Sequence, residues 1–267
     1  MTEPIHRLPP SARRTSGGTP LEFSDILVGT YGPFARTVFR HTVLFIFRLF
    51  FRLKVEGVEN VPQTGPLIIV SNHLHNLDPV MLVAAMPRAT HFMAKAEAFA
   101  VPVIGAIMRW GGAFPVERGK MDRRALRRAE ATLDQGIALG IYPEGTRSPT
   151  LALKEPFAGA GLFVLRSGAP VVPVIITGSE RLPGNGKKGT LAPGVVYPEP
   201  GHRGVRLRFG KPFHVPREID GRRISAAEAA DLMMLELAKM LPAPYRGVYS
   251  HRVVDKENPR PTTPAAD

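Results

Sequence analysis

The stretch PLIIVSNHLHNLDP, residues 66–79, decides the fold because it places a buried strand directly before a polar cluster and a helix start. Residues 67–71 are apolar except for the final serine, and such a continuous run is typical of a strand covered on both faces. Asp78 precedes Pro79, a pair typical of a helix N-cap followed by the first helical residue. The stretch therefore predicts a strand, a short polar loop and a helix that Asp78 caps.

Strand and helix patterns alternate along the rest of the chain. Further strands are expected at 91–94, at the start of 140–148, at 170–178 and, as an edge strand, at 204–213. Helices are expected at 159–168, where a glycine ends the helix, and at 229–241, where Ser225 and Glu228 form a capping box. This alternation predicts an α/β fold, a single domain with a mixed, largely parallel sheet covered by helices.

The composition narrows the classes of partner and of chemistry. The 267-residue chain carries 35 Lys and Arg against 23 Asp and Glu, a formal charge of +12. This excess favours an anionic partner such as a membrane surface, a phosphorylated substrate or nucleic acid. The chain contains no cysteine, which excludes a disulfide framework, a thiol nucleophile and a cysteine-based metal centre. Any metal site would depend on histidines and carboxylates.

The chain divides into four segments. Residues 1–21 contain Arg and Pro but no apolar signal-peptide core, so we expect a flexible leader and a cytosolic protein. Residues 22–54 hold an amphipathic helix, and residues 55–242 form the α/β domain. Residues 243–267 are polar and contain several prolines, so we expect a disordered tail.

The amphipathic segment is rich in Phe and Leu over residues 34–54, but Arg36, Arg40, Arg48 and Arg52 interrupt it at helical spacing. Its uncharged apolar runs are shorter than the roughly 18–20 residues that span a bilayer. One interpretation is a helix lying in the membrane interface, with the arginines at anionic head groups. The other is a helix docked on the protein's own core with its arginines in water. The broad Phe-rich face favours the membrane interpretation.

The polar cluster at 72–78 admits three interpretations. His73, His75 and Asp78 could ligate a metal, although the cluster lacks an adjacent third histidine. Asp78 could serve only as a helix cap. Its carboxylate could also accept the Nδ1–H of His73, which would fix the tautomer, leave Nε2 as a base and stabilise the imidazolium. Taken alone, the spacing leaves these alternatives open.

Three further blocks follow in order: GAFPVER at 112–118, YPEGTRS at 142–148 and VVPVI at 171–175. Together with the Asn-His-x4-Asp block that contains His73 and Asp78, they resemble the four blocks of the glycerolipid acyltransferases. The resemblance is to the bacterial 1-acyl-sn-glycerol-3-phosphate (lysophosphatidic acid) acyltransferases in particular, and it extends from about residue 55 to residue 212. One departure is Tyr142, where the family usually has Phe.

The resemblance implies a site drawn from several of these blocks. His73 would be the general base for the acceptor hydroxyl, and Asp78 would orient the imidazole. The other implied residues bind substrate or lie near it: Arg118 and Arg147 for the acceptor phosphate, Gly145 for a close backbone approach, Thr146 as a hydroxyl donor, and Lys95 and Glu144 beside the site.

The activity implied by the resemblance is transfer of an acyl group from acyl-CoA or acyl carrier protein to the sn-2 hydroxyl of lysophosphatidic acid, giving phosphatidic acid. No metal or redox cofactor is expected. The expected partners are the lysophospholipid, the acyl donor and an anionic membrane surface, not nucleic acid, with the protein peripheral at the cytoplasmic face of the cell membrane. The alternatives are another lyso-lipid acceptor, a metal-dependent hydrolase, and a catalytically silent membrane- or nucleic-acid-binding module.

Overall fold

The computed structural model describes residues 32–100, 105, 108, 111–116, 123–184 and 204–253. Seven strands form one sheet in the order β1-β7-β6-β2-β5-β3-β4. They are β1 (Lys54–Glu56), β2 (Leu67–Ser71), β3 (Thr90–Lys95), β4 (Phe114–Val116), β5 (Ala138–Ile141), β6 (Val171–Thr177) and β7 (Arg206–Phe209). The strands β2 to β6 are mutually parallel, and β7 pairs antiparallel with β6 and parallel with β1. The predicted mixed, largely parallel sheet is confirmed.

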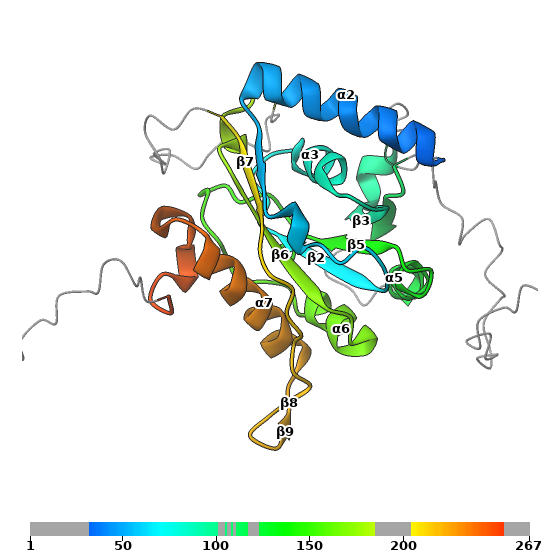
Figure 1. Cartoon of the computed structure of the whole chain (residues 1–267). Helices are drawn as coiled ribbons and strands as arrows, with labels where there is room; N and C mark the ends of the chain where they lie inside the picture. Colours follow the sequence, from blue (N-terminus) through cyan, green and yellow to red (C-terminus); the bar gives the residue numbers. More distant parts are fainter. Residues whose placement is uncertain are drawn as a thin grey trace, which may run out of the picture.

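Helices cover both faces of the sheet (Figure 1). The longer helices are α2 (Pro33–Phe51), α3 (Asp78–Ala85), α5 (Arg123–Asp134), α6 (Ala158–Ser167) and α7 (Ala226–Met240). The short elements are the 3-10 helices η1 (Val58–Asn60), η2 (Ala96–Ala100), η3 (Ser179–Arg181), η5 (Ala243–Tyr245) and η6 (Gly247–Tyr249), and the hairpin of β8 (Glu218–Ile219) and β9 (Arg222–Arg223).

The central strand β2 is buried on both sides, as its unbroken apolar run predicts. Ile68 and Val70 pack in the core formed with α5, α6 and α7. Leu67 and Ile69 pack in a second core formed with α2 and α3. Because alternate side chains of a strand point to opposite faces, one short run of sequence anchors both layers.

The predicted helix ends are confirmed at two places. Helix α6 ends at Gly168, which adopts the left-handed conformation (φ 63°) that closes a helix. Helix α7 begins with the predicted capping box, in which the Ser225 hydroxyl accepts from the Glu228 amide and the Glu228 carboxylate accepts from the Ser225 amide.

The prediction that 204–213 forms an edge strand is wrong. Strand β7 lies between β6 and β1, with Lys54 opposite Arg206. The three residues of β1 follow α2 closely and carry no strand signal of their own. Their pairing depends on where α2 delivers the chain, which local sequence does not encode.

The predicted disordered tail from residue 243 is also wrong over its first part. Residues 243–253 contain η5 and η6, and Tyr245 and Tyr249 are buried in the core with α7. The Tyr245 hydroxyl donates to Glu180 (2.9 Å), and the Tyr249 hydroxyl donates to Asp231 (3.0 Å). Burial of two large aromatic rings offsets the entropy cost of ordering this polar segment. Residues 254–267 and the leader at 1–21 lie outside the described residues.

Helix α2 lies along α3 and combines features of both sequence interpretations (Figure 1). Leu44 and Phe47 are buried in the core shared with α3, as expected of a docked helix. Phe34, Phe45 and Phe50 remain 82%, 65% and 70% exposed. Within the described ranges, no helix combines the length and the apolar character needed to cross a membrane.

Candidate active site

The polar blocks converge at one edge of the sheet. Because β2, β5 and β6 are parallel, their carboxyl ends meet at the same edge, where open α/β sheets bind ligands. His73 lies two residues after β2, and Tyr142 follows β5 directly. The Asn72 side chain donates to the Ile176 carbonyl and accepts from the Ile176 amide, both at 2.8 Å. This paired contact fixes the loop after β2 to the end of β6.

Asp78 is the hydrogen-bond centre of that loop. Its fully buried carboxylate uses Oδ2 to accept from Nδ1 of His73 (3.0 Å) and from the amides of Leu74 and His75 (both 2.7 Å). Three donors converging on one oxygen hold both the loop and the imidazole in place.

The expected cap role of Asp78 requires correction. Helix α3 begins at Asp78 itself, and its N-cap is Leu77, which makes no side-chain cap bond. The Asp78 amide donates to the His75 carbonyl (3.0 Å), and its carboxylate also bonds to the loop. Asp78 therefore stabilises the loop that precedes α3 and does not cap the first turn of this helix.

His73 is the part of the pair that solvent reaches. Its side chain is 13% exposed, whereas that of Asp78 is 0% exposed. Because Nδ1 faces Asp78, Nε2 is the ring nitrogen left for a substrate. The Tyr142 ring stacks on the imidazole, with centroids 4.2 Å apart and planes inclined by 19°.

The 142–148 loop is bonded directly to the loop of His73. The Ser148 amide donates to the His73 carbonyl (2.8 Å), and the Gly145 amide donates to the Tyr142 carbonyl (2.9 Å) in a tight turn. Gly145 has φ +67°, and a Cβ placed there would lie 2.6 Å from the Phe157 ring. The left-handed backbone conformation therefore favours glycine at this position, and a larger residue would also have to displace the half-exposed Phe157 ring.

Glu144 is buried beneath this turn and interacts with the segment of Lys154. Its Oε2 accepts from the Lys154 amide (3.3 Å), and the Lys154 ammonium donates to the Thr146 hydroxyl. Burial raises the pKa of Glu144 to about 7, although the Lys154 charge acts in the opposite direction. Glu144 thus carries a proton at moderately acid pH.

Replacement of Glu144 by Gln is expected to change how stability depends on pH. The pKa is about 7 in the folded protein against 4.5 in the unfolded chain, so the protonated carboxyl favours folding below pH 4.5, and this advantage is lost as pH rises through 7. Relative to the Gln variant, the wild type should lose on the order of 3 kcal/mol of unfolding free energy between pH 4 and pH 8, measured by urea unfolding.

The matched control is Glu130→Gln, which changes a surface glutamate paired with Arg166. Surface ion pairs contribute little to stability, so this variant should track the wild type across the same pH range. A constant difference between wild type and the Glu144 variant from pH 4 to pH 8 would show that this carboxyl is not titrating abnormally.

The remaining predicted residues differ in where they lie. Burial is the main cause that lowers the pKa of His75, and Asp78 raises it. The charge of Arg147 also lowers this pKa, which shows that Arg147 lies near His75. Lys95 is half-exposed at the end of β3 and pairs with Glu97 (2.8 Å) rather than with the His73–Asp78 pair. Arg118 lies outside the described residues.

Two contributors to the site were missed by the sequence analysis. Asn72 ties the loop to β6, and Tyr142 covers one face of His73. Both lie within blocks that were recognised, Asn72 directly before His73 and Tyr142 at the start of YPEGTRS. A polar residue at a strand end and an aromatic residue beside a charged turn were the available signals.

In the part of the chain that the structure describes, no group of three or more His, Asp or Glu could hold a metal ion.

The fold and the site together define an α/β protein with a His–Asp pair at the carboxyl edge of its sheet, an arrangement suited to acid–base chemistry. The family model for acyltransferases matches residues 52–177, which contain this pair and the 142–148 loop. A 1-acyl-sn-glycerol-3-phosphate acyltransferase of Bacillus subtilis is 31% identical over 153 residues, covering 57% of this chain and 74% of that protein. The chain belongs to the acyltransferase family.

Two further relatives add to this comparison. A chloroplast 1-acyl-sn-glycerol-3-phosphate acyltransferase of Arabidopsis thaliana is 30% identical over 191 residues, which cover 68% of this chain and 50% of the relative. The chain spans about half the length of several such relatives. The crystal structure of the 1-acyl-sn-glycerophosphate acyltransferase PlsC of Thermotoga maritima shares the fold, with a TM-score of 0.56 at 24% identity, covering 74% of this chain and 76% of that one.

Proposed function

We propose that this protein transfers an acyl group from acyl-CoA or acyl carrier protein to the sn-2 hydroxyl of lysophosphatidic acid, forming phosphatidic acid. The observation that carries the proposal is the partly exposed His73 held by the buried Asp78, with the 142–148 loop bonded to the His73 backbone. The names of the relatives support the choice of acceptor. No metal or redox cofactor takes part in the proposed reaction.

The chemical step needs a base and an orienting group. Nε2 of His73 takes the proton of the acceptor hydroxyl while the oxygen of that hydroxyl attacks the carbonyl carbon of the thioester. The tetrahedral oxyanion then collapses, the C–S bond breaks, and the thiolate leaves with the proton from His73. Asp78 stabilises the imidazolium that exists between these two proton transfers.

Acceptor binding is assigned to the 142–148 loop. The guanidinium of Arg147 can hold two phosphate oxygens at once, and the left-handed turn at Gly145 lets the backbone approach the ligand. Thr146 adds a hydroxyl that already accepts from Lys154, which brings a second cation to the loop. Arg118 and Lys95 are further proposed contributors to phosphate binding.

The test is an acyl-transfer assay with labelled acyl-CoA and a panel of acceptors, read by mass spectrometry. Wild type should acylate lysophosphatidic acid in preference to monoacylglycerol, which lacks the phosphate, and Arg147→Ala should raise the apparent KM for the phosphorylated acceptor alone. Preferred acylation of another lyso-lipid would replace the acceptor in the proposal. Metal-dependent hydrolysis without transfer would replace the activity.

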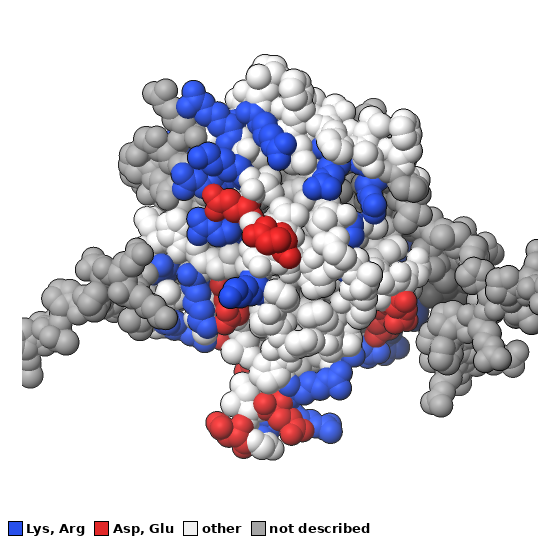
Figure 2. Space-filling model, viewed as in Figure 1, with Lys and Arg blue, Asp and Glu red and all other residues white. Residues whose placement is uncertain are grey.

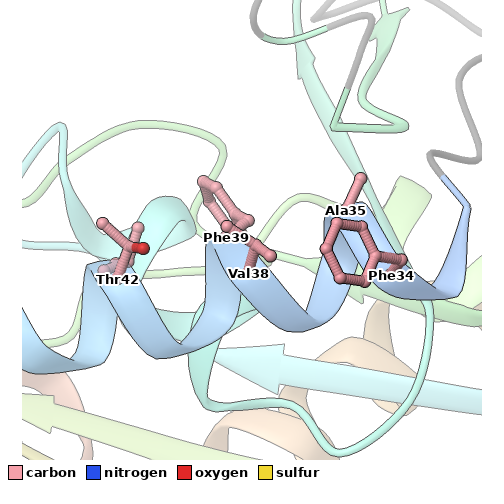
Figure 3. A pocket seen from close by; sticks show the side chains of 6 residues that line it. Phe34, Ala35, Val38, Phe39 and Thr42 are labelled. Atoms are coloured by element: carbon pink, nitrogen blue, oxygen red, sulfur yellow. The ribbon is translucent and has the colours of Figure 1, made fainter.

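We also propose that α2 rests in the interface of an anionic membrane, at the cytoplasmic face of the cell membrane, so that lipid acceptors reach the site. Its outer face exposes Phe34, Val38, Phe45, Ile46, Leu49 and Phe50. Near its first residues a shallow apolar groove of about 430 Å³ is lined by Phe34, Ala35, Val38, Phe39, Thr42 and Val43 (Figure 3). Figure 2 shows Lys and Arg side chains gathered around the last residues of α2, at the other end of the helix from this groove.

The basic end of α2 adjoins two strands that carry further basic side chains, of which Arg208 in β7 is paired with Glu56 in β1. Arg48 lies in the last turn of α2 and Arg52 caps it, while Lys54 in β1 is opposite Arg206 in β7. Apolar side chains beside a cationic cluster are the combination that binds anionic bilayer surfaces.

Removing apolar contacts from α2 should weaken binding to vesicles. The double variant Phe45→Ser, Phe50→Ser removes two largely exposed rings, each worth about 1.5–3 kcal/mol when buried, so affinity should fall by at least about tenfold. Co-sedimentation with vesicles containing phosphatidylglycerol measures the effect, and neutral phosphatidylcholine vesicles should bind less. Ile219→Ser, on the β8 hairpin, is the control. Equal binding by wild type and the double variant would remove α2 from the membrane contact.

A further inference from the structure

Three aromatic rings are stacked at the carboxyl edge of the sheet. Tyr142 lies against His73 on one side, with ring centroids 4.2 Å apart, and near Phe92 of β3, with centroids 5.7 Å apart. Tyr142 is held in place by β5, which pairs with both β2 and β3. The imidazole therefore rests on a ring that is itself supported by the sheet.

The Tyr142 hydroxyl does not account for this placement. The hydroxyl oxygen is buried and has no hydrogen-bond partner in the described part of the chain. Burial, together with the charge of Asp78, raises the pKa of Tyr142, so the phenol stays neutral. A buried hydroxyl without a partner costs stability, so the ring is the feature that benefits the site.

We propose that Tyr142 is a positioning residue for His73, whose ring holds the imidazole against Asp78 and stabilises the imidazolium formed during proton transfer. This inference rests on the proposed function, in which His73 is the general base. An imidazolium lying over an aromatic face gains electrostatic attraction to the ring as well as contact area. The stacking geometry also prevents the imidazole from rotating away from Asp78.

The other charged groups around His73 make an uncharged partner useful. Asp78, at the start of α3, contacts Nδ1 of His73, and the positive charge of Arg147 on the 142–148 loop acts on the neighbouring His75. Glu144, with a pKa of about 7 set by burial, adds a charge that varies with pH, beside Lys154. Stacking on Tyr142 stabilises the imidazolium without adding another charge to a site that must bind an anionic acceptor.

The experiment compares Tyr142→Leu, which removes the ring, with Tyr142→Phe, which keeps it and removes the hydroxyl. NMR follows the Nδ1–H signal of His73 in the full chain, assigned with a His73 variant, as a report of its bond to Asp78. Tyr142→Leu should broaden or abolish this signal, because the imidazole loses the ring that holds it against Asp78. In the same variant kcat should fall about tenfold, with KM for the acceptor little changed. Tyr142→Phe should match wild type in all of these measurements.

Two outcomes would overturn the inference: a His73 Nδ1–H signal in Tyr142→Leu equal to that of wild type, or an equal effect in Tyr142→Phe. If the Leu variant does not fold, Tyr142→Met fills the space with a flexible side chain and takes its place. The NMR measurement needs no substrate, so it decides the role of Tyr142 even if wild type proves inactive on lysophosphatidic acid. Inactivity of the wild type would count against the proposed function alone.

Discussion

Replacement of His73 by Ala is expected to lower acyl transfer by about 10²–10⁴-fold, because the acceptor hydroxyl loses its general base. The effect should appear in kcat, since the groups proposed to bind the acceptor phosphate lie on the separate 142–148 loop. The fold should survive, because Asp78 still accepts from the amides of Leu74 and His75 at 2.7 Å. Purified protein assayed with labelled acyl-CoA and lysophosphatidic acid measures the loss.

A second histidine provides the control for this prediction. His214 is exposed and follows Phe213, which bridges to Val171 at the amino end of β6, the opposite edge of the sheet from His73. His214→Ala should therefore transfer acyl groups at the wild-type rate. Near wild-type kcat in the His73→Ala protein, with both variants folded, would remove His73 from the chemistry.

Much of the fold could be predicted from local sequence. The run at 67–71 identifies the central strand because a strand buried on both faces can contain hardly any polar residues. Gly168 and the Ser225–Glu228 box mark helix ends because capping is decided within a few residues. The order of the blocks, placed after successive strands, also brings them to one edge of the sheet once the strands are parallel.

The features that were missed depend on contacts between distant segments. The pairing of β1 with β7 joins Lys54 to Arg206, and the burial of Tyr245 depends on Glu180. The same holds for the residues of the site. The pairing of His73 with Asp78 could be predicted because the two residues are close in sequence, whereas the stacking of Tyr142 on His73 requires β5 to lie beside β2. Lys95 pairs with Glu97 (2.8 Å), two residues further along the chain, and its part in phosphate binding stays a prediction.

Two substitutions of Asp78 should separate its charge from its hydrogen bonds. Asn can place its carbonyl oxygen where Oδ2 lies and still accept from His73, Leu74 and His75, but it carries no negative charge. Asp78→Asn should therefore unfold at nearly the wild-type urea concentration while kcat falls by about 10²–10³-fold, because the imidazolium has lost its counter-ion.

Asp78→Ala should lose activity to a similar extent and also lose stability. It removes the oxygen that accepts from the amides of Leu74 and His75, and the loss of each buried hydrogen bond costs about 1–3 kcal/mol, so its urea midpoint should fall well below that of the Asn variant. Urea unfolding followed by circular dichroism and the acyl-transfer assay measure the two effects on the same preparations. Wild-type kcat in the Asn variant would show that Asp78 serves the loop alone, since geometry without charge would then suffice for the base.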